Sequence, residues 1–398
     1  MPGPLDGFRV VEACQMVAGP LAGSMLADLG ADVIKIESPA GGDRMRYLGH
    51  RIGDIGAFWM MCNRGKRSVV FDLGAPDGVA ALRDLVATAD VFIQNFRPGV
   101  VDRLGISDHD LREVCPDLIY VSVSGFGDTG PYADQKSYDY VIQALSGMAA
   151  LQADPNTGEP TLLRNVVIDK ATAYAAVQAV MGAIIARDRG AGGQHIRLAM
   201  LDVAIAFLWP DGMMQHTLLD TERVTPGPHM ADDYLVRPTA DGYIALLATS
   251  KTQFPGLCAA LGTEHWLNDP RFSTRTERER HMSELSALIS AEVVARDGAE
   301  LIERLHRHDV PCALLNPIAD VHLDPQVIHN EVLVEHHRPW LGTVREPRPA
   351  ARYSATPTTL DRHAPKLDEH TDEILADIGR TADDIADLRA RAIIGPRQ

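Results

Sequence analysis

The sequence predicts an α/β protein with a Rossmann-like, doubly wound parallel sheet and a second, smaller α+β domain. Its 398 residues are too many for one ordinary hydrophobic core. Short apolar strands alternate with helix-length segments from residue 8 to residue 124. The chain then turns rich in proline, glycine and polar residues near 215–240, which is typical of a linker into another domain.

The first βαβ unit lies at the N-terminus. A strand in FRVVEA, a helix in GPLAGSMLADLG and a strand in ADVIKIE follow one another, and two strands joined through a helix are expected to be parallel. The alternation continues with SVVFDL (strand), DGVAALRDLVATA (helix), DVFIQNF (strand), GVVDRLG and SDHDLREVC (short helices) and LIYVSVSGF (strand). Ligands of such sheets bind beyond the carboxyl ends of the strands, so the loops after Glu12, Glu37, Phe96 and Ser124 are expected to border the site.

The second half of the chain begins with a long helix, about Lys170 to Arg187, which DRGAGG ends. One more strand and a buried helix follow in QHIRLAMLDVAIAFLW. The small domain is expected to hold the strand YIALLAT, the helix of QFPGLCAALG, one charged helix in TRTERERHMSELSALISAEVVA, and GAELIERLHRHDVPCALL. From about residue 317 we expect irregular, proline-rich chain up to final helices in TDEILADIG and TADDIADLRARA.

Composition excludes several classes of function. A net charge of −16 disfavours nonspecific binding to nucleic acid or to an anionic membrane. No uncharged apolar run reaches the length of a membrane span, and the first residues lack the pattern of a secretory signal, so the cytoplasm is expected. The five cysteines and fifteen histidines show neither C-x-x-C nor H-E-x-x-H spacing, so we expect no disulfide framework and no metal.

The segment GFGDTG, Gly125 to Gly130, matches the dinucleotide fingerprint G-x-G-x-x-G and follows a strand. However, Pro131 and a polar stretch follow it where the fingerprint requires a helix, and it lies on a late strand. We therefore expect no NAD, and we interpret the segment as a loop that borders the site.

Basic side chains gather where the loops of the sheet are expected. They are Arg64, Lys66 and Arg67 in NRGKR, Arg97 in NFRPG, Arg103 and Lys136. Each one alone is interpreted as solvated surface charge. In an acidic protein, however, the set together favours binding of phosphate groups, with the amide of Asn95 as a further donor.

Asp169 stands at the start of the long helix, after the apolar residues Val166 to Ile168. Aspartate is a preferred N-cap, and the helix dipole favours negative charge at that end, so capping alone explains its position. A carboxylate among apolar neighbours is also desolvated and therefore more reactive than one in water. The two roles, cap and nucleophile, are compatible.

Several segments together resemble the class III CoA-transferases, the family of formyl-CoA:oxalate and carnitine CoA-transferases and of 2-methylacyl-CoA racemase. The resemblance rests on PLDGFRVVEACQMVAGPLAGSMLADLGADVIKIE, NRGKRSVVFDL, DVFIQNFRPGVVDRLG, LIYVSVSGFGDTGPY, GGQHIRLAMLDV and PKLDEHTDEIL. These segments span nearly the whole chain in the order of the family, so the match is highly specific.

This resemblance implies an interlocked homodimer of two ring-like chains. Each chain would have a large Rossmann-like, CoA-binding domain in residues 1–215, a small domain in 225–325, and a C-terminal segment, 330–398, that returns to the large domain. Asp169 falls on the catalytic aspartate of the family. The residues implied to bind CoA are Val17, Ala18, Phe71, Asp72, Leu73, Gly74, Asn95, Phe96, Arg97, Arg103, Lys136, Ser137, Tyr138 and Asp139.

The implied reaction is a reversible transfer of CoA from a donor thioester, such as succinyl-CoA, to a carboxylic acid. Asp169 would attack the thioester to form a mixed anhydride, and CoA would return to form an aspartyl-CoA thioester. No external base is expected, because an aspartate near its usual pKa of about 3.9 is ionised at neutral pH. Coenzyme A would be a substrate, with no tightly bound cofactor.

Three positions depart from the family pattern. The racemases carry His-Asp where this chain has Tyr138-Asp139, and tyrosine is a poor proton-transfer group at neutral pH, which favours transfer over racemisation. Val17 replaces the glutamine of the formyl-CoA branch, so formate and oxalate are not the expected acids. Asp368 replaces a glycine in the C-terminal motif. An acyl-CoA racemase and a non-catalytic CoA-binding protein remain the alternatives.

Overall fold

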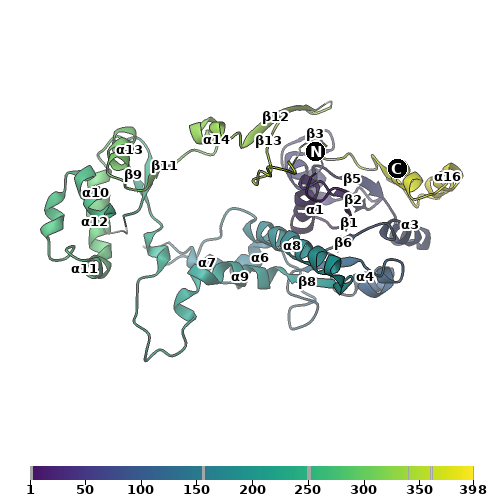
Figure 1. The fold of residues 1–398 in the computed structure, drawn as a ribbon, viewed down its shortest axis with the longest axis horizontal. Coiled ribbons are helices and arrows are strands. Elements are labelled where there is room, and N and C mark those ends of the chain that lie inside the picture. The colour runs from purple at the N-terminus through teal and green to yellow at the C-terminus, as the bar shows by residue number, and fades with distance from the viewer. Residues whose placement is uncertain are drawn as a thin grey trace. The chain divides into compact units, whose positions relative to one another are not determined.

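Two units make up the chain in the computed structural model, which describes residues 3–154, 157–248, 252–338, 340–358, 360 and 362–397. Unit 1 comprises Met1–Leu208 and Glu331–Gln398, and unit 2 comprises Trp209–Asn330. Unit 1 therefore contains both ends of the chain, which are marked in Figure 1.

A six-stranded sheet forms the centre of unit 1. Its strands are β1 (Arg9–Ala13), β2 (Asp32–Glu37), β5 (Arg67–Val70), β6 (Val91–Gln94), β7 (Ile119–Ser124) and β8 (His195–Ala199). They lie in the order β5-β2-β1-β6-β7-β8, and every neighbouring pair is parallel. The predicted doubly wound parallel sheet is thus confirmed. The order reverses between β1 and β6, the place where such sheets hold their ligands.

Successive residues of a strand point to opposite sides of the sheet. Apolar residues lie on both sides here, and helices cover both faces. On one face Val11 packs in a core with α3 (Pro76–Val86), α15 (Thr371–Asp377) and α16 (Ala382–Ala390). On the other face Val10 packs with α1 (Ala18–Asp28) and α8 (Val167–Ala186), which lie against each other (Figure 1). The C-terminal helices therefore complete a core that the N-terminal strands begin.

The other helices of unit 1 connect the strands or follow them. They are η1 (Arg44–Tyr47), α2 (Ala57–Asn63), α4 (Val100–Leu104), α5 (Asp108–Arg112), α6 (Asp139–Leu145), α7 (Met148–Leu151), η2 (Arg187–Ala191) and α9 (Met200–Gly212), whose last residues belong to unit 2. Helix α8 begins three residues earlier than predicted, which changes the position of Asp169 in it.

Two hairpins of unit 1 were not predicted. They are formed by β3 (Arg51–Ile52) with β4 (Ile55–Gly56) and by β12 (Leu333–Arg338) with β13 (Gly342–Pro347). The expectation of irregular chain after residue 317 is therefore wrong for this second hairpin. Its strand LVEHHR is only partly buried and lacks the regular apolar alternation that marks a half-buried strand.

Unit 2 holds a three-stranded antiparallel sheet, β11-β10-β9, made of β9 (Val236–Pro238), β10 (Tyr243–Leu246) and β11 (Cys312–Leu314). Its helices are η3 (Met214–His216), η4 (Met230–Asp233), α10 (Gln253–Leu261), η5 (Glu264–Asn268), α11 (Arg275–Arg280), α12 (Met282–Val293), α13 (Gly298–Arg307), η6 (Val321–Leu323) and α14 (Pro325–His329). The single charged helix predicted here is divided, because His281 leaves the helical conformation between α11 and α12.

Candidate active site

Asp169 is the third residue of α8, and the position before the helix is occupied by Val166, which provides no side-chain cap. The expectation that Asp169 caps the helix is therefore wrong. The cap comes from another helix: Oδ2 of Asp139 accepts hydrogen bonds from the N–H groups of Ile168 (2.7 Å) and Asp169 (2.9 Å). Asp169 thus keeps its own carboxylate free of the capping role.

Asp139 is the first residue of α6 and is only 5% exposed. Its Oδ1 accepts a hydrogen bond of 2.5 Å from Nε2 of Gln143, one turn later. The same Nε2 donates to the carbonyl of Asn165 (3.0 Å) and so ties α6 to the chain that enters α8. Asp139 and Gln143 therefore fix the direction in which α8 starts.

The electrostatic environment of Asp169 differs from what we expected. Burial raises the pKa of the Asp169 carboxyl to about 7, with a further contribution from the charge of Asp139. A hydrogen bond from the backbone N–H of Ala18 acts in the opposite direction. The expectation of a pKa near the ordinary value is thus corrected: near neutral pH this carboxyl is divided between its acid form and its nucleophilic carboxylate form.

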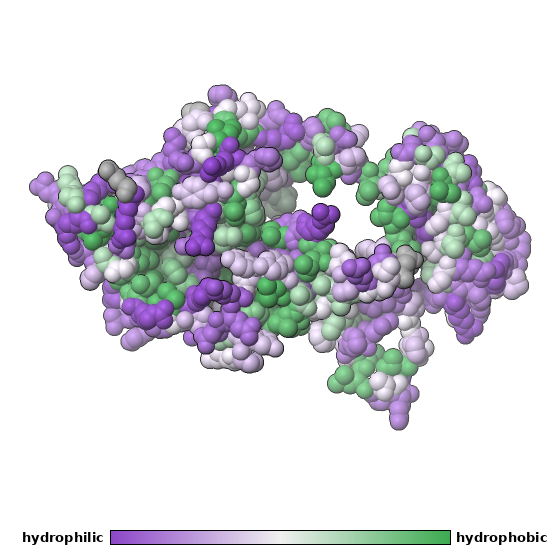
Figure 2. Space-filling view, turned by 180° about the vertical axis from the view of Figure 1, so that it is seen from behind, coloured by the Kyte–Doolittle hydropathy of each residue, from purple (hydrophilic) through white to green (hydrophobic). Residues whose placement is uncertain are grey.

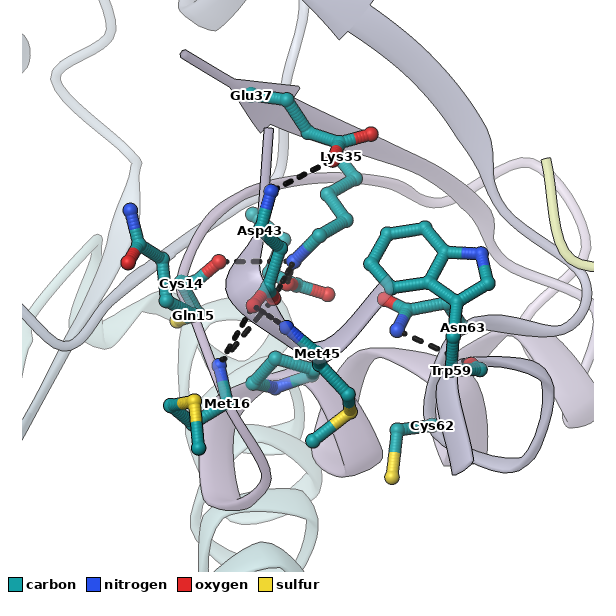
Figure 3. Close-up of polar contacts among 12 residues, drawn as sticks. Cys14, Gln15, Met16, Lys35, Glu37, Asp43, Met45, Trp59, Cys62 and Asn63 are labelled. Carbon is teal, nitrogen blue, oxygen red and sulfur yellow. Dashed lines mark hydrogen bonds and ion pairs between the residues drawn. The ribbon is translucent and has the colours of Figure 1, made fainter. Parts of the chain in front are cut away.

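A cluster of buried charges lies next to the chain at Cys14 and Met16, which precedes α1 (Figure 3). The Lys35 ammonium contacts Glu12 (2.9 Å), Asp43 (3.2 Å) and the carbonyl of Cys14 (2.8 Å). The ammonium of Lys66 contacts the other oxygen of Glu12 at 2.5 Å. Burial opposes ionisation of Glu12, but the two ammonium groups hold its pKa below the usual range. The cluster contains two ammonium groups and two carboxylates, so its net charge is zero, and each charge is buried beside an opposite one.

This charge cluster reaches the active site through Asp43. Its carboxylate accepts the N–H of Met16 (3.2 Å), and Met16 has a left-handed φ of 68°, a conformation that costs energy for a residue with a side chain. Helix α1 begins two residues later, at Ala18. The charges therefore hold the turn that directs the N–H of Ala18 toward Asp169, where the N-terminal ends of α1 and α8 meet.

Three of the predicted phosphate-binding residues are free for that role. Arg97, Arg103 and Lys136 are exposed, and among the described residues none of them forms an ion pair with a carboxylate. Arg97 lines a cavity of about 390 Å³ beyond the carboxyl ends of β6 and β7, together with Phe96. Cations in such a position suit the phosphates of a nucleotide-bearing substrate.

The other three basic residues of the predicted set pair with carboxylates of the protein itself. Arg64 pairs with Asp28 (2.7 Å), Lys66 lies in the buried charge cluster, and Arg67 pairs with Asp32 (2.6 Å). The hypothesis that these three bind phosphate is wrong. The sequence NRGKR precedes β5, so Arg67 lies at the amino end of the parallel strands, opposite the edge that Arg97 follows.

The remaining implied CoA contacts fall into two groups. The side chains of Val17 and Phe71 are buried in the hydrophobic cores, 4% and 1% exposed, so only their backbones can meet a ligand. Partly or fully exposed are Asp72, Leu73, Gly74, Ser137 and Tyr138. The amide of Asn95 is already engaged, because it donates to the carbonyl of Gln15 (2.8 Å) and accepts its N–H (2.9 Å). Asn95 therefore positions the loop after β1.

The loop with Gly125 to Gly130 packs against the segment that carries Ser137. A Cβ added at Gly125 would lie 2.0 Å from Oγ and 2.4 Å from Cβ of Ser137. The glycine is thus required for this close approach and not for phosphate contact. Tyr138 follows, 51% exposed, with its ring stacked on that of Tyr140 at 6.0 Å.

Sequence reasoning missed Asp43, Gln143 and Cys62. Burial raises the pKa of the Cys62 thiol to about 11, and the charge of Asp169 contributes to this shift. Cys62 is therefore a neutral thiol near Asp169 and a weak nucleophile. Cys62 directly precedes the family segment NRGKR, but nothing in the sequence of that segment indicated that Cys62 lies near Asp169.

Neither a metal-binding cluster nor a membrane-spanning helix is found among the described residues. Within those ranges, no group of three or more His, Cys, Asp and Glu side chains is arranged to hold a metal ion. None of the helices described there is both long and apolar enough to cross a membrane.

Comparison with known proteins gives consistent matches over the whole chain. The sequence model of CoA-transferase family III matches residues 5–371. The succinate–glutarate CoA-transferase of Agrobacterium fabrum is 37% identical over 385 residues, which are 94% of this chain and 96% of that protein. The succinyl-CoA–D-citramalate CoA-transferase of Chloroflexus aurantiacus is 34% identical over 99% of this chain and 98% of its own length. A CaiB/BaiF family protein from Brucella suis, whose crystal structure is known, is 34% identical with a TM-score of 0.82, over 95% of this chain and 100% of that one.

Proposed function

The chain belongs to CoA-transferase family III and is an acyl-CoA:carboxylate CoA-transferase, and from this premise we propose that Asp169 is its nucleophile, with succinyl-CoA as donor and a small dicarboxylic acid as acceptor. One observation carries the role of Asp169. Its carboxylate lies at the meeting point of two helix N-termini, desolvated but not used as a cap. The substrates are proposed from the relatives, whose names give succinate with glutarate and succinyl-CoA with D-citramalate.

The first half of the reaction releases the donor acid. A carboxylate oxygen of Asp169 attacks the thioester carbonyl, the C–S bond breaks, and CoA leaves as a thiolate, which leaves a mixed anhydride on Asp169. The thiolate then attacks the Asp169 carbonyl of the anhydride. This step forms an aspartyl-CoA thioester and frees the donor as a carboxylate.

The second half repeats these steps in reverse with the acceptor. Its carboxylate attacks the aspartyl thioester and expels CoA thiolate, and the thiolate attacks the acceptor acyl carbon of the new anhydride. The products are the new acyl-CoA and a free Asp169 carboxylate. Every step exchanges one carboxylate or thiolate for another, so the protein must chiefly exclude water and orient the groups.

The proposed CoA site combines three exposed cations with the loop that packs against Ser137. Arg97, Arg103 and Lys136 would neutralise the phosphates, since they are exposed and have no carboxylate partner among the described side chains. The loop 125–130 is the proposed source of hydrogen bonds to the oxyanion on the substrate carbonyl, and the N–H of Ala18, which already donates to Asp169, is the proposed donor to the oxyanion that forms when thiolate attacks the Asp169 carbonyl.

We further propose that the chain acts as an interlocked homodimer. Figure 2 shows apolar residues, in green, at the surface among the polar ones on the face in view. Helix α9 exposes three large apolar side chains, because Ile205, Phe207 and Trp209 are 37%, 57% and 41% exposed. Large apolar side chains so exposed along one helix are typical of a surface that another chain covers.

The decisive experiment traps the intermediate on Asp169. The protein is incubated with succinyl-CoA and treated with borohydride, which reduces an aspartyl thioester, and the peptide with residues 164–187 is examined by mass spectrometry. We expect reduced Asp169 in the wild-type chain and at least about a 10³-fold loss of transfer in Asp169→Ala. An unmodified peptide together with full activity of that variant would contradict the proposal.

Two alternatives predict different results. A racemase would exchange the α-proton of a 2-methylacyl-CoA with deuterium from solvent in the absence of any acceptor acid. Tyr138 is exposed and stands where the resemblance places the histidine of the racemases, and a phenol is a weaker proton-transfer group than an imidazole, so it gives no support to such a proton transfer. A non-catalytic CoA-binding protein would retain every measurable function in Asp169→Asn.

A further inference from the structure

Unit 2 contains a cavity of about 470 Å³ that is separate from the residues described above. It lies between α10, α11, α12 and the end of β10. Its wall is mostly apolar and includes Leu235, Leu246, Phe254 and Ile289. This volume is within the range of small-molecule sites, roughly 300–1,000 Å³.

One buried cation lines this apolar wall. Arg237, in the middle of β9, is only 8% exposed. Its Nη1 donates to the carbonyl of Ser286 (2.9 Å) and to Oγ of Ser290 (2.5 Å), and its Nη2 donates to Oγ of Ser286 (3.0 Å). All three acceptors are neutral and lie on α12. Among the described residues, no carboxylate forms an ion pair with this guanidinium.

The unused part of Arg237 is the edge that carries Nε. The Nε–H is buried and has no acceptor, and one hydrogen of Nη2 is also unused, within the described part of the chain. The Nε and Nη2 atoms of Arg46, Arg64 and Arg67 instead hold both oxygens of a carboxylate. A side-on guanidinium edge is the standard bidentate partner of a carboxylate.

The other charged groups of the cavity do not compensate Arg237. Arg275 and Glu279 pair with each other at 2.7 Å, and the guanidinium of Arg278 lies over the ring of Phe254 at 4.5 Å. Asp232 also lines the cavity but does not contact Arg237. Burial lowers the pKa of the Arg237 guanidinium, and no acidic group counteracts this effect. Burying a cation without a counter-ion costs free energy. The binding of an anion beside Arg237 would offset this cost.

We propose that this cavity is a binding site for an organic acid with an apolar chain, whose carboxylate binds Arg237. The acid's chain would contact the apolar wall. Because the Nε atom is enclosed, the carboxylate must displace part of the wall to reach it. Met214, Met230 and Met282 line the cavity, and methionine side chains adapt readily to such a displacement. The site does not depend on the chemistry at Asp169.

The location can be tested on the unaltered full chain with sodium octanoate as the probe. The thirteen methionines are labelled with ¹³C at their methyl groups, and the three cavity methionines are assigned by Met→Leu replacement. We expect saturable shifts of Met214, Met230 and Met282, while Met45 in the core of unit 1 stays unchanged. Octan-1-ol, which has the chain but no carboxylate, should bind at least about tenfold more weakly. No shift at the three methionines, or equal shifts with the alcohol, would overturn the proposal.

The role of Arg237 is tested by calorimetric titration of variants with octanoate. We expect Arg237→Gln to weaken binding roughly tenfold or more, and Arg237→Lys, which lacks the planar edge, to be intermediate. Arg275→Gln is the matched control, because this cavity arginine already pairs with Glu279. Equal affinities of Arg237→Gln and the wild type would refute the assignment. If Arg237→Gln fails to fold, the methionine shifts of the unaltered chain decide the question.

Discussion

At the scale of single residues, the relation between Asp139 and Asp169 determines the reactivity of the site. Asp139 holds the N-terminus of α8 through two hydrogen bonds and, by its charge, raises the pKa of Asp169 above the value that burial alone would give. Positioning and electrostatics therefore come from the same carboxylate. That Asp139 contacts CoA, as the resemblance implies, stays a prediction; its carboxylate accepts hydrogen bonds from Gln143, Ile168 and Asp169.

This relation predicts the pH dependence of CoA transfer. The nucleophile is the carboxylate form, and the pKa of Asp169 is raised to about 7, so kcat/KM should increase with pH up to about 7 and level off above it. Asp139→Asn keeps an oxygen for the two N–H groups but removes the charge. We therefore expect kcat/KM of this variant to rise at lower pH than that of the wild type. Its kcat at high pH should lie within about tenfold of the wild-type value.

The measurement is the initial rate of transfer from succinyl-CoA over a range of pH. Asp134→Asn is the control, because Asp134 is an exposed acid in the same segment. If kcat/KM of Asp139→Asn rose over the same pH range as that of the wild type, the charge of Asp139 would not raise the pKa of Asp169.

Asp368 shows how one substitution is accommodated. The residue lies in the left-handed region with φ at 67°, which explains why glycine is usual there in the family. Its carboxylate accepts a hydrogen bond of 2.8 Å from Nη1 of Arg389. This charged contact offsets the strain of the backbone.

At the scale of elements, the approach of the loop 125–130 to Ser137 is a site of tight packing. Gly125→Ala places its Cβ against Ser137, whose Cβ cannot move without the backbone. We expect a loss of about 1–3 kcal/mol in stability and a higher KM for the acyl-CoA, because the neighbouring Lys136 moves with the segment. Thermal unfolding and steady-state kinetics measure the two effects.

Two variants test this explanation. Gly182→Ala in α8 is the control, since nothing lies within 4 Å of the added Cβ. Gly125→Ala combined with Ser137→Gly removes the clash and should recover most of the loss. A Gly125→Ala chain as stable and active as the control would show that the two segments do not pack as described.

The buried charge cluster joins β1, β2 and the chain that enters β5. Lys66→Met leaves Glu12 with one cation in place of two and should destabilise the chain by about 3–5 kcal/mol. The double variant Glu12→Gln with Lys66→Met removes one charge of each sign, so we expect it to recover part of this loss. Melting temperatures measure the effect, with the exposed Lys366→Met as control. A double variant less stable than Lys66→Met would contradict the pairing.

At the scale of the whole molecule, unit 1 is built from two separate pieces of sequence, whereas unit 2 is one continuous piece. The core on one face of the sheet of unit 1 includes Leu375 and Leu388 from the C-terminal segment beside Val11 from the first strand. Unit 2 is inserted between these parts and has its own core around Phe254, Phe272 and Leu301. Truncation before α15 would therefore expose the core of unit 1.

The proposed homodimer is tested on the surface of α9. We expect the 43.3 kDa chain to sediment as a dimer at micromolar concentration, and Phe207→Asp to weaken association about tenfold or more. Ile318→Asp is the matched control, because Ile318 is 96% exposed but lies outside α9. A wild-type chain that is monomeric at this concentration would exclude the proposed assembly.

The sequence by itself determined the parallel sheet, the family and the identity of the candidate nucleophile. Strand and helix periodicity are local properties, and the family segments before and after Asp169 place it on the catalytic aspartate of the family, so no tertiary contact was needed for these conclusions. The β12–β13 hairpin and the break at His281 escaped prediction, because neither is marked by a local pattern.

Only the tertiary structure decided how the charged residues are used. Arg64, Lys66 and Arg67 resembled Arg97 in sequence, but the carboxylates with which they pair in the interior lie 35 to 54 positions away along the chain. In the same way, Asp139 caps α8 from another helix and so leaves Asp169, the proposed nucleophile, without a capping role. The role of a charge depends on its burial and on its partner, and both are set by contacts between residues distant in sequence.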